Sequence, residues 1–156
     1  MTTLFFDFET TGLNPFHDKI IEYSFIRGIN GDYITELINP EQTISTKITC
    51  ITNITNEMLN GNPTISQKKD EIISFINESV EHDNQTIYMI AHNCDGFDKF
   101  LLQRIFNKNN NREMDVFKKI KFIDTIHLAK LLLPNMRSVS LKTLCKIFDI
   151  TAGTHR

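Results

Sequence analysis

The stretch FFDFETTGL, residues 5–13, places two acids in the middle of a segment with the composition of a buried strand. Because successive side chains of a strand point to opposite faces, Asp7 and Glu9 share one face. The apolar residues around them face the other way, toward a core: Leu4, Phe6 and Phe8. Two neighbouring carboxylates repel each other, and burying either without compensation is unfavourable. We therefore expect buried acids that bind a cation, with a purely structural role as the alternative. Oxygen ligands favour Mg²⁺ or Mn²⁺ over zinc.

Length and composition indicate one ordinary globular domain. The chain has 156 residues, of which 40% are hydrophobic and 23% charged. No apolar run approaches the roughly 18 residues of a membrane span, and no basic-then-apolar leader precedes the first strand. The three cysteines show neither zinc-site spacing nor a disulfide framework. We expect an intracellular protein, cytoplasmic or nuclear, that is not secreted, has no membrane partner and keeps its thiols reduced.

The charge of the chain restricts how it could bind a nucleic acid. The formal net charge is −2, which argues against a broad basic surface that grips a polyanion. A nucleic-acid partner would therefore have to be bound through metal ions and a few local lysines.

The pattern of apolar and turn residues predicts three strands in a row, followed by alternating helices and strands. The expected strands are 4–10, 20–28, 33–39, 86–92 and 121–125, and the expected helices are 63–80, 95–107, 125–133 and one that begins after Ser140. Thr64 and Gln67 have capping-box spacing, and Asp95 is the expected N-cap of the second helix. We expect residues 107–113 to be a solvated loop. The prediction is an α/β layered domain with a mixed five-stranded sheet.

Two further segments carry residues suited to chemistry. AHNCDGFDKFLL, residues 91–102, reads as strand, polar turn and helix, so Asp98 lies in the first helical turn at the carboxyl end of a strand. Ligand sites of open α/β sheets lie at that edge. A helix-dipole carboxylate is the alternative for Asp98 alone. GTHR, residues 153–156, contains His155, whose ordinary pKa of about 6.5 suits a general base.

In this order, FDFETTGL, AHNCDGFDKFLL and GTHR resemble the three motifs of the DnaQ-like, DEDDh 3′–5′ exonucleases. The segments ITNITNEML, FIDT, LAK and SLKTLC also fall where that family has similar segments, so the resemblance spans nearly the whole chain. The HNCDGFD spacing is similar to that of animal three-prime repair exonucleases. The resemblance implies a ribonuclease H-like three-layer fold, with helices on both faces of the mixed five-stranded sheet.

The implied activity is metal-dependent release of nucleoside monophosphates from the 3′ end of a single-stranded nucleic acid, as in repair or proofreading. We expect DNA rather than RNA, but the sequence leaves that choice open. With two Mg²⁺ or Mn²⁺ ions, Asp7 would bridge both, Glu9 would hold the water-activating ion and Asp98 would support the second. His155 would be the general base.

The resemblance also implies contacts with the terminal nucleotide. Thr10, Thr11 and Gly12 would supply backbone and hydroxyl contacts, and Leu13 would wedge against the base. The family turn at His92 and Asn93 would approach the site. We read Asp124 as a helix cap or hydrogen-bond anchor because it starts a helix.

The family pattern continues beyond this chain, since its fourth acid would fall five positions after His155. Three explanations for the missing fourth acid are open. The chain is part of a longer gene product, it is a naturally short protein that is inactive or completed by a partner, or another acid substitutes. Asp149 is a poor substitute. We expect residues 1–156 to be one catalytic domain that lacks its last helix and is impaired. The alternative is a non-catalytic nucleic-acid-binding or adaptor domain. A homodimer and a polymerase or repair partner both remain open.

Overall fold

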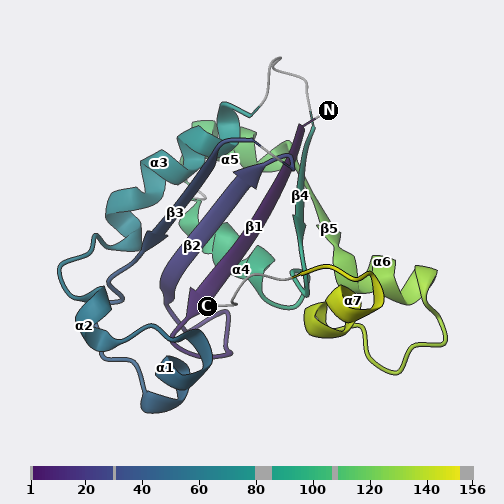
Figure 1. Ribbon diagram of the computed structural model, residues 1–156. Coiled ribbons are helices and arrows are strands. Elements are labelled where there is room, and N and C mark those ends of the chain that lie inside the picture. The colour runs from purple at the N-terminus through teal and green to yellow at the C-terminus, as the bar shows by residue number, and fades with distance from the viewer. Residues whose placement is uncertain (1, 30, 80–85, 107–108, 152–156) are drawn as a thin grey trace.

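Five strands form one sheet in the order β3-β2-β1-β4-β5 (Figure 1). The computed structural model describes residues 2–29, 31–79, 86–106 and 109–151. The strands are β1 (Thr2–Thr10), β2 (Ile20–Arg27), β3 (Tyr33–Leu37), β4 (Ile87–Ala91) and β5 (Ile120–Asp124). The first three run antiparallel, and β4 and β5 pair in parallel with β1 and with each other. The predicted strand meander and mixed sheet are confirmed.

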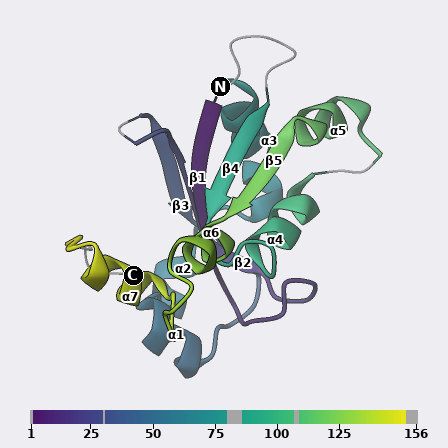
Figure 2. The same cartoon turned by 90° about the vertical axis from the view of Figure 1, so that its right-hand side faces the viewer.

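Helices lie on both sides of this sheet. They are α1 (Thr46–Thr52), α2 (Asn56–Leu59), α3 (Ile65–Asn77), α4 (Asp98–Ile105), α5 (Asn111–Lys118), α6 (Thr125–Leu132) and α7 (Leu141–Ile147). In the view from the β5 edge, α3, α4 and α5 lie on one side and α7 on the other (Figure 2). The predicted fold class is confirmed.

The main core fills the space between the sheet and α3, α4 and α5. As expected, Leu4, Phe6 and Phe8 of β1 are buried in it. The Phe6 ring stacks on Phe25 of β2, with ring centroids 6.1 Å apart. This packing fixes which face of β1 points into the core, and the acids of β1 must take the opposite face.

A bulge in β2 divides the core near the end of β1. Glu9 pairs with Glu22 and Thr10 pairs with Ile20, so Ile21 is the extra residue. Ile20 belongs to the main core, whereas Ile21 joins a second cluster with residues of α1 and α2. The bulge therefore lets two consecutive isoleucines be buried in different clusters.

Several helix boundaries differ from those expected. Residues 107–113 are not all loop, because Asn110 caps α5 and accepts from the backbone N–H of Arg112 at 3.1 Å. Asp95 is not an N-cap, since α4 begins at Asp98 after Phe97. Apolar residues recur at helical spacing in α7, at Leu141, Leu144 and Cys145, but none of them is buried, and Phe148, which follows the helix, is 58% exposed.

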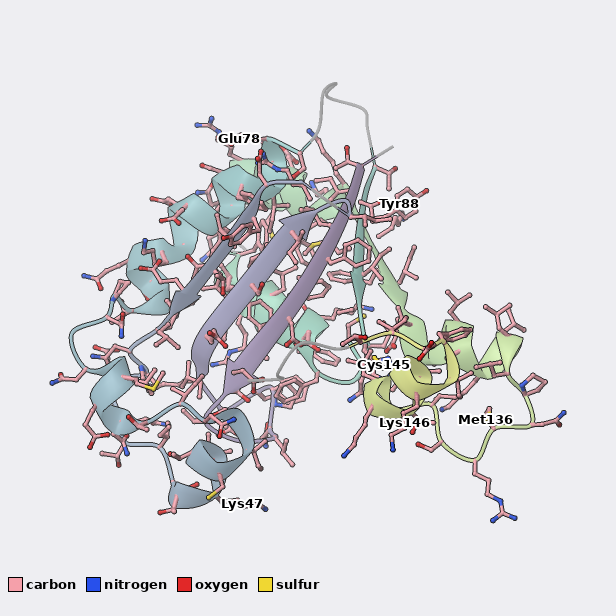
Figure 3. All side chains as sticks on the ribbon, in the orientation of Figure 1. Lys47, Glu78, Tyr88, Met136, Cys145 and Lys146 are labelled. Atoms are coloured by element: carbon pink, nitrogen blue, oxygen red, sulfur yellow. The ribbon has the colours of Figure 1, made fainter. Side chains whose placement is uncertain are left out.

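Other local predictions are confirmed. The backbone N–H of Thr64 donates to the Gln67 side chain at 2.8 Å, and Ser140 caps α7. The three cysteines are free thiols. Met136, in the connection before α7, and Lys146, on α7, lie apart from the sheet (Figure 3). Val80, the last residue of the expected helix 63–80, lies outside the described residues.

Candidate active site

Asp98, the first residue of α4, lies next to β1 just beyond the point where β4 stops pairing with β1. The parallel pairing of β1 with β4 ends at Phe5 and Ile90, so the following part of β1 has no strand partner on that side among the described residues. The backbone N–H of Phe8 donates there to the Asp98 carboxylate. Asp98 thus lies beside the segment that carries Asp7 and Glu9 and is close enough to Asp7 to feel its charge. Among the described residues, however, these three acids do not bring their ligand atoms within 4.8 Å of one another.

Burial gives Asp98 unusual properties. Its side chain is 4% exposed, and its Oδ1 atom has no hydrogen-bond partner among the described residues. Burial, followed by the nearby charge of Asp7, raises the pKa of Asp98 to about 7. A buried carboxylate oxygen without a partner is stabilised by a proton or by a cation. The donor set of three carboxylates therefore fits a hard divalent ion.

The expectation that both β1 acids are buried is wrong. Asp7 is exposed and Glu9 is half-buried, because α3, α4 and α5 pack against the opposite face of β1. The energetic cost of burying charge falls on Asp98 instead. The case for a cation therefore rests on Asp98 and on repulsion among neighbouring acids.

The loop after β1 is held by an acid that the sequence reasoning did not single out. Asp18 accepts from the Thr11 hydroxyl at 2.8 Å and from the backbone N–H of Asn14 at 2.8 Å. A Cβ at Gly12 would lie 2.5 Å from Asp18 Oδ2, so any other residue there would displace the Asp18 carboxylate. An acid five residues beyond Leu13 in a turn-rich segment was the available signal.

Of the residues expected to contact the nucleotide, two have hydroxyls engaged within this loop. Thr10 is buried and its hydroxyl donates to the Gly12 carbonyl at 2.5 Å, and the Thr11 hydroxyl donates to Asp18. Leu13 is 84% exposed at the loop surface, as a residue that wedges against a base must be. The structure thus assigns Thr10 and Thr11 to shaping the loop.

The turn after β4 is organised by Asp124, as predicted. Its carboxylate caps α6 by accepting from Ile126 N–H at 2.9 Å, and it also accepts the N–H groups of Asn93 at 2.9 Å and Asp95 at 3.1 Å. Burial opposes ionisation, but these three donors outweigh it and hold the pKa of Asp124 below its ordinary value. His92 Nδ1 lies 2.9 Å from the Thr125 hydroxyl. His92 and Asn93 are therefore bound to the start of α6.

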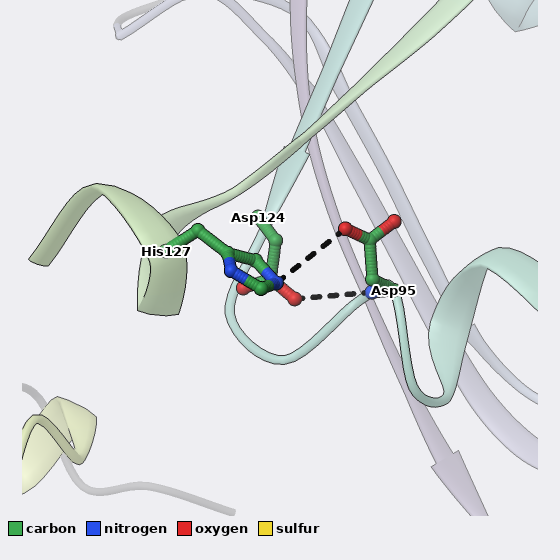
Figure 4. Close-up of side chains that lie close together, drawn as sticks. All are labelled: Asp95, Asp124 and His127. Carbon is green, nitrogen blue, oxygen red and sulfur yellow. Dashed lines mark hydrogen bonds and ion pairs between the residues drawn. The ribbon is translucent and has the colours of Figure 1, made fainter. Parts of the chain in front are cut away.

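A second group with metal-ligand chemistry lies at this turn. Asp95, Asp124 and His127 bring one ligand atom each within 4.8 Å of the others (Figure 4). His127 Nε2 is 3.6 Å from Asp95 Oδ2, and Asp95 also pairs with Lys99 at 3.3 Å. Because the Asp124 oxygens already accept three backbone N–H groups, we read this group as a structural junction between α4 and α6.

His155, the expected general base, lies outside the described residues. Among the described helices, none is long and apolar enough to cross a membrane.

A mixed five-stranded sheet with acids on its central strand and at the start of α4 is the arrangement of a DnaQ-like nuclease. The family model RNase_T, described as exonuclease, matches residues 4–156. The chain belongs to this exonuclease family.

A bacterial DNA polymerase is also similar to this chain. The chain is 35% identical over 153 residues to the "DNA polymerase III PolC-type" of Halalkalibacterium halodurans. The match covers 96% of this chain and 10% of that protein. The chain thus spans about a tenth of the length of the curated relatives it matches.

Solved structures are similar in fold. Exonuclease I of E. coli in complex with a dA16 oligonucleotide has a TM-score of 0.72 and 20% sequence identity to this chain. The superposition covers 97% of this chain and 36% of the exonuclease I chain. Exonuclease X in complex with 5′ overhanging duplex DNA has a TM-score of 0.65 and 22% identity, over 97% and 76% of the two chains. These likenesses confirm the ribonuclease H-like fold.

Proposed function

We propose that this chain is a metal-dependent 3′–5′ exonuclease domain that releases nucleoside monophosphates from the 3′ end of single-stranded DNA. The observation that carries the proposal is the buried Asp98 carboxylate, which has an unpartnered oxygen and feels the charge of Asp7. Family membership supports the reaction and a dependence on divalent metal ions.

The acids supply the charge that hydrolysis of a phosphodiester requires. Two bound Mg²⁺ or Mn²⁺ ions would neutralise the phosphate and activate water. In the proposed arrangement Asp7, Glu9 and Asp98 would hold the ions. His155 would take the proton from the attacking water. Residues 1–156 are proposed as one catalytic domain, and the impairment expected from the sequence stays a prediction.

The loop after β1 is the proposed binding place for the terminal nucleotide. Leu13 lies exposed at its surface and would stack against the last base, because apolar side chains bind unpaired bases without sequence preference. The hydrogen bonds of Asp18 keep that loop in place. We propose DNA because the solved neighbours are bound to DNA, and a polymerase as partner because of the PolC-type relatives. The intracellular location and any homodimer stay predictions.

The direct test is digestion of a single-stranded oligonucleotide that carries a label at its 5′ end. With Mn²⁺ or Mg²⁺, we expect products shortened one nucleotide at a time from the 3′ end, and no digestion in EDTA. Asp7→Asn and Asp98→Asn should abolish the reaction. Asp32→Asn is the control, because it removes the same charge from a side chain that is 84% exposed in the β2–β3 connection.

Two results would contradict the proposal. One is the absence of shortened products at any protein concentration, combined with no Mn²⁺ binding that depends on Asp7. The other is strand binding that needs no divalent ion and survives Asp7→Ala, which would favour the non-catalytic binding domain. An RNA strand of the same sequence, digested in parallel, tests the preference for DNA, because that preference depends on contacts with the 2′-hydroxyl.

A further inference from the structure

The loop after β1, residues 11–18, is attached to the last turn of α4. Arg104 Nη1 donates to the backbone carbonyls of Pro15 at 2.8 Å and Asp18 at 2.7 Å. Hydrogen bonds donated by a charged group are stronger than those between neutral groups. Because both acceptors are backbone atoms, Arg104 restrains the path of the loop itself and not the side chains on it.

An aromatic contact supports the same attachment. The ring of Phe16, in the loop, lies 5.1 Å from the ring of Phe100 on α4, measured between ring centroids. Phe100 precedes Arg104 by four residues, so both side chains lie on one side of the helix. The loop therefore meets α4 at two neighbouring positions, one polar and one apolar.

Asp18 extends this restraint to the rest of the loop. Its carbonyl accepts from Arg104, and its carboxylate accepts from the Thr11 hydroxyl and the Asn14 N–H, each at 2.8 Å. Leu13 lies between Thr11 and Asn14, and its side chain is exposed. The residue proposed to stack against the terminal base thus belongs to a segment that is held on both sides.

We propose that Arg104 is a positioning residue for the 3′-terminal nucleotide: by holding the loop, it keeps Leu13 in place relative to Asp98, the first residue of the same helix. This inference rests on the proposed function. One eight-residue helix then carries both an acid proposed to hold a metal ion and the residue that fixes the nucleotide loop. A loop that is already ordered binds its ligand with a smaller loss of conformational entropy. Loss of Arg104 should therefore weaken strand binding and leave metal binding unchanged.

The test compares Arg104→Met with the natural protein in three measurements. They are KM and kcat for a 5′-labelled single strand with Mn²⁺, the affinity for a strand whose 3′-terminal linkage resists hydrolysis, and the affinity for Mn²⁺. We expect KM and the strand dissociation constant to rise by about 10-fold. We expect kcat and Mn²⁺ affinity to stay within about 2-fold, because the lost binding is shared by the ground state and the transition state. Unchanged Mn²⁺ affinity also shows that the variant is folded.

Two matched variants separate hydrogen bonding from charge. Arg104→Lys keeps several N–H donors on one nitrogen and should hold KM within about 3-fold of the natural value. Arg112→Met removes the same charge from an exposed residue of α5 and should change none of the three measurements.

A double substitution tests whether Arg104 acts through the loop. With Leu13→Ala already present, adding Arg104→Met should raise KM by less than about 3-fold more, because residues that act as one unit are not additive. Two independent effects that multiply would mean that Arg104 acts on the strand directly and is not a positioning residue.

The outcomes separate this inference from the proposed function. If the natural protein neither shortens nor binds the strand, the proposed function is wrong and the inference falls with it. If the natural protein binds the strand and Arg104→Met binds it equally well, only the role of Arg104 is overturned. The same holds if Arg104→Met loses Mn²⁺ affinity to the same extent as strand affinity.

Discussion

Replacing Asp98 with asparagine should make the metal-free protein more stable at neutral and alkaline pH, although the same change should abolish activity. The side chain keeps its shape and can still accept from the N–H of Phe8, but it no longer carries a buried charge. Stability and activity should thus change in opposite directions, as they do where a site is built for a ligand that the empty protein lacks.

The magnitude follows from the pKa of Asp98. A pKa of about 7 against an ordinary value of 3.8 means that ionising Asp98 in the folded chain costs about 4 kcal/mol at high pH, at about 1.4 kcal/mol for each pH unit. The asparagine amide would lack an acceptor where Oδ1 lies, which costs about 1–3 kcal/mol. The net gain is therefore roughly 1–3 kcal/mol, and each kcal/mol raises the Tm of a chain of this size by about 2–4 °C.

The pH dependence has a definite sign. Between about pH 4 and pH 7 the folded protein holds a proton on Asp98 that the unfolded chain has released, so this group makes stability fall as pH rises. Below about pH 4 both states are protonated and the effect vanishes. Asp98→Asn lacks this decline, and its free energy of unfolding relative to the natural protein should therefore increase across that window.

The assay is urea unfolding of both proteins in EDTA at several pH values from about 4 to 8. Subtracting the two curves cancels the contributions of all other titrating groups that the substitution leaves unperturbed. Parallel curves, or a variant that is less stable at pH 8, would show that Asp98 carries no uncompensated charge. In a second series with Mn²⁺, only the natural protein should gain stability.

Three further changes test the surroundings of the site by thermal unfolding. Gly12→Ala should destabilise the protein by about 1–3 kcal/mol, because the new Cβ would lie 2.5 Å from Asp18; an unchanged Tm would mean that the loop is not held by this acid. Asp124→Asn should lower the free energy of unfolding by about 1–3 kcal/mol, because the amide cannot accept all three backbone N–H groups. An unchanged stability would contradict the anchoring role of Asp124. Lys69→Met should cost about 1–3 kcal/mol, since Glu113, 2.9 Å away and nearly buried, loses its cation; a neutral result would mean that other partners of Glu113 suffice.

The sheet could be predicted because its strands carry strong local signals. The alternation of Leu4, Phe6 and Phe8 with polar residues marks β1, and polar turns separate it from β2 and β3. The short helices α1 and α2 gave no such signal. Each spans at most two turns and is stabilised by its cap, Ser45 or Thr55, and by packing in the second cluster. Such caps look like ordinary loop residues when only the sequence is read.

The sequence indicates where the three acids lie on the fold, but it does not give the environment of each. The two-residue period of a strand puts Asp7 and Glu9 on one face, and a helix that follows a strand places Asp98 near that edge. Which face of β1 is covered depends on tertiary packing, so the exposure of Asp7 could not be read from the sequence. The burial of Asp98 likewise depends on the residue at which β4 stops pairing with β1. That residue is set by the register of the two strands.

The distance between the acids of β1 and the acid of α4 is fixed by two attachments of that helix. At its start, Asp98 accepts from the Phe8 N–H. In its last turn, Arg104 donates to the carbonyls of Pro15 and Asp18 at 2.8 and 2.7 Å, in the loop that directly follows β1. These attachments of the helix to the same strand and loop, near both of its ends, oppose any movement of its first residue away from Asp7. The repulsion is therefore retained in the folded protein, and a bound cation can relieve it without rearranging the chain.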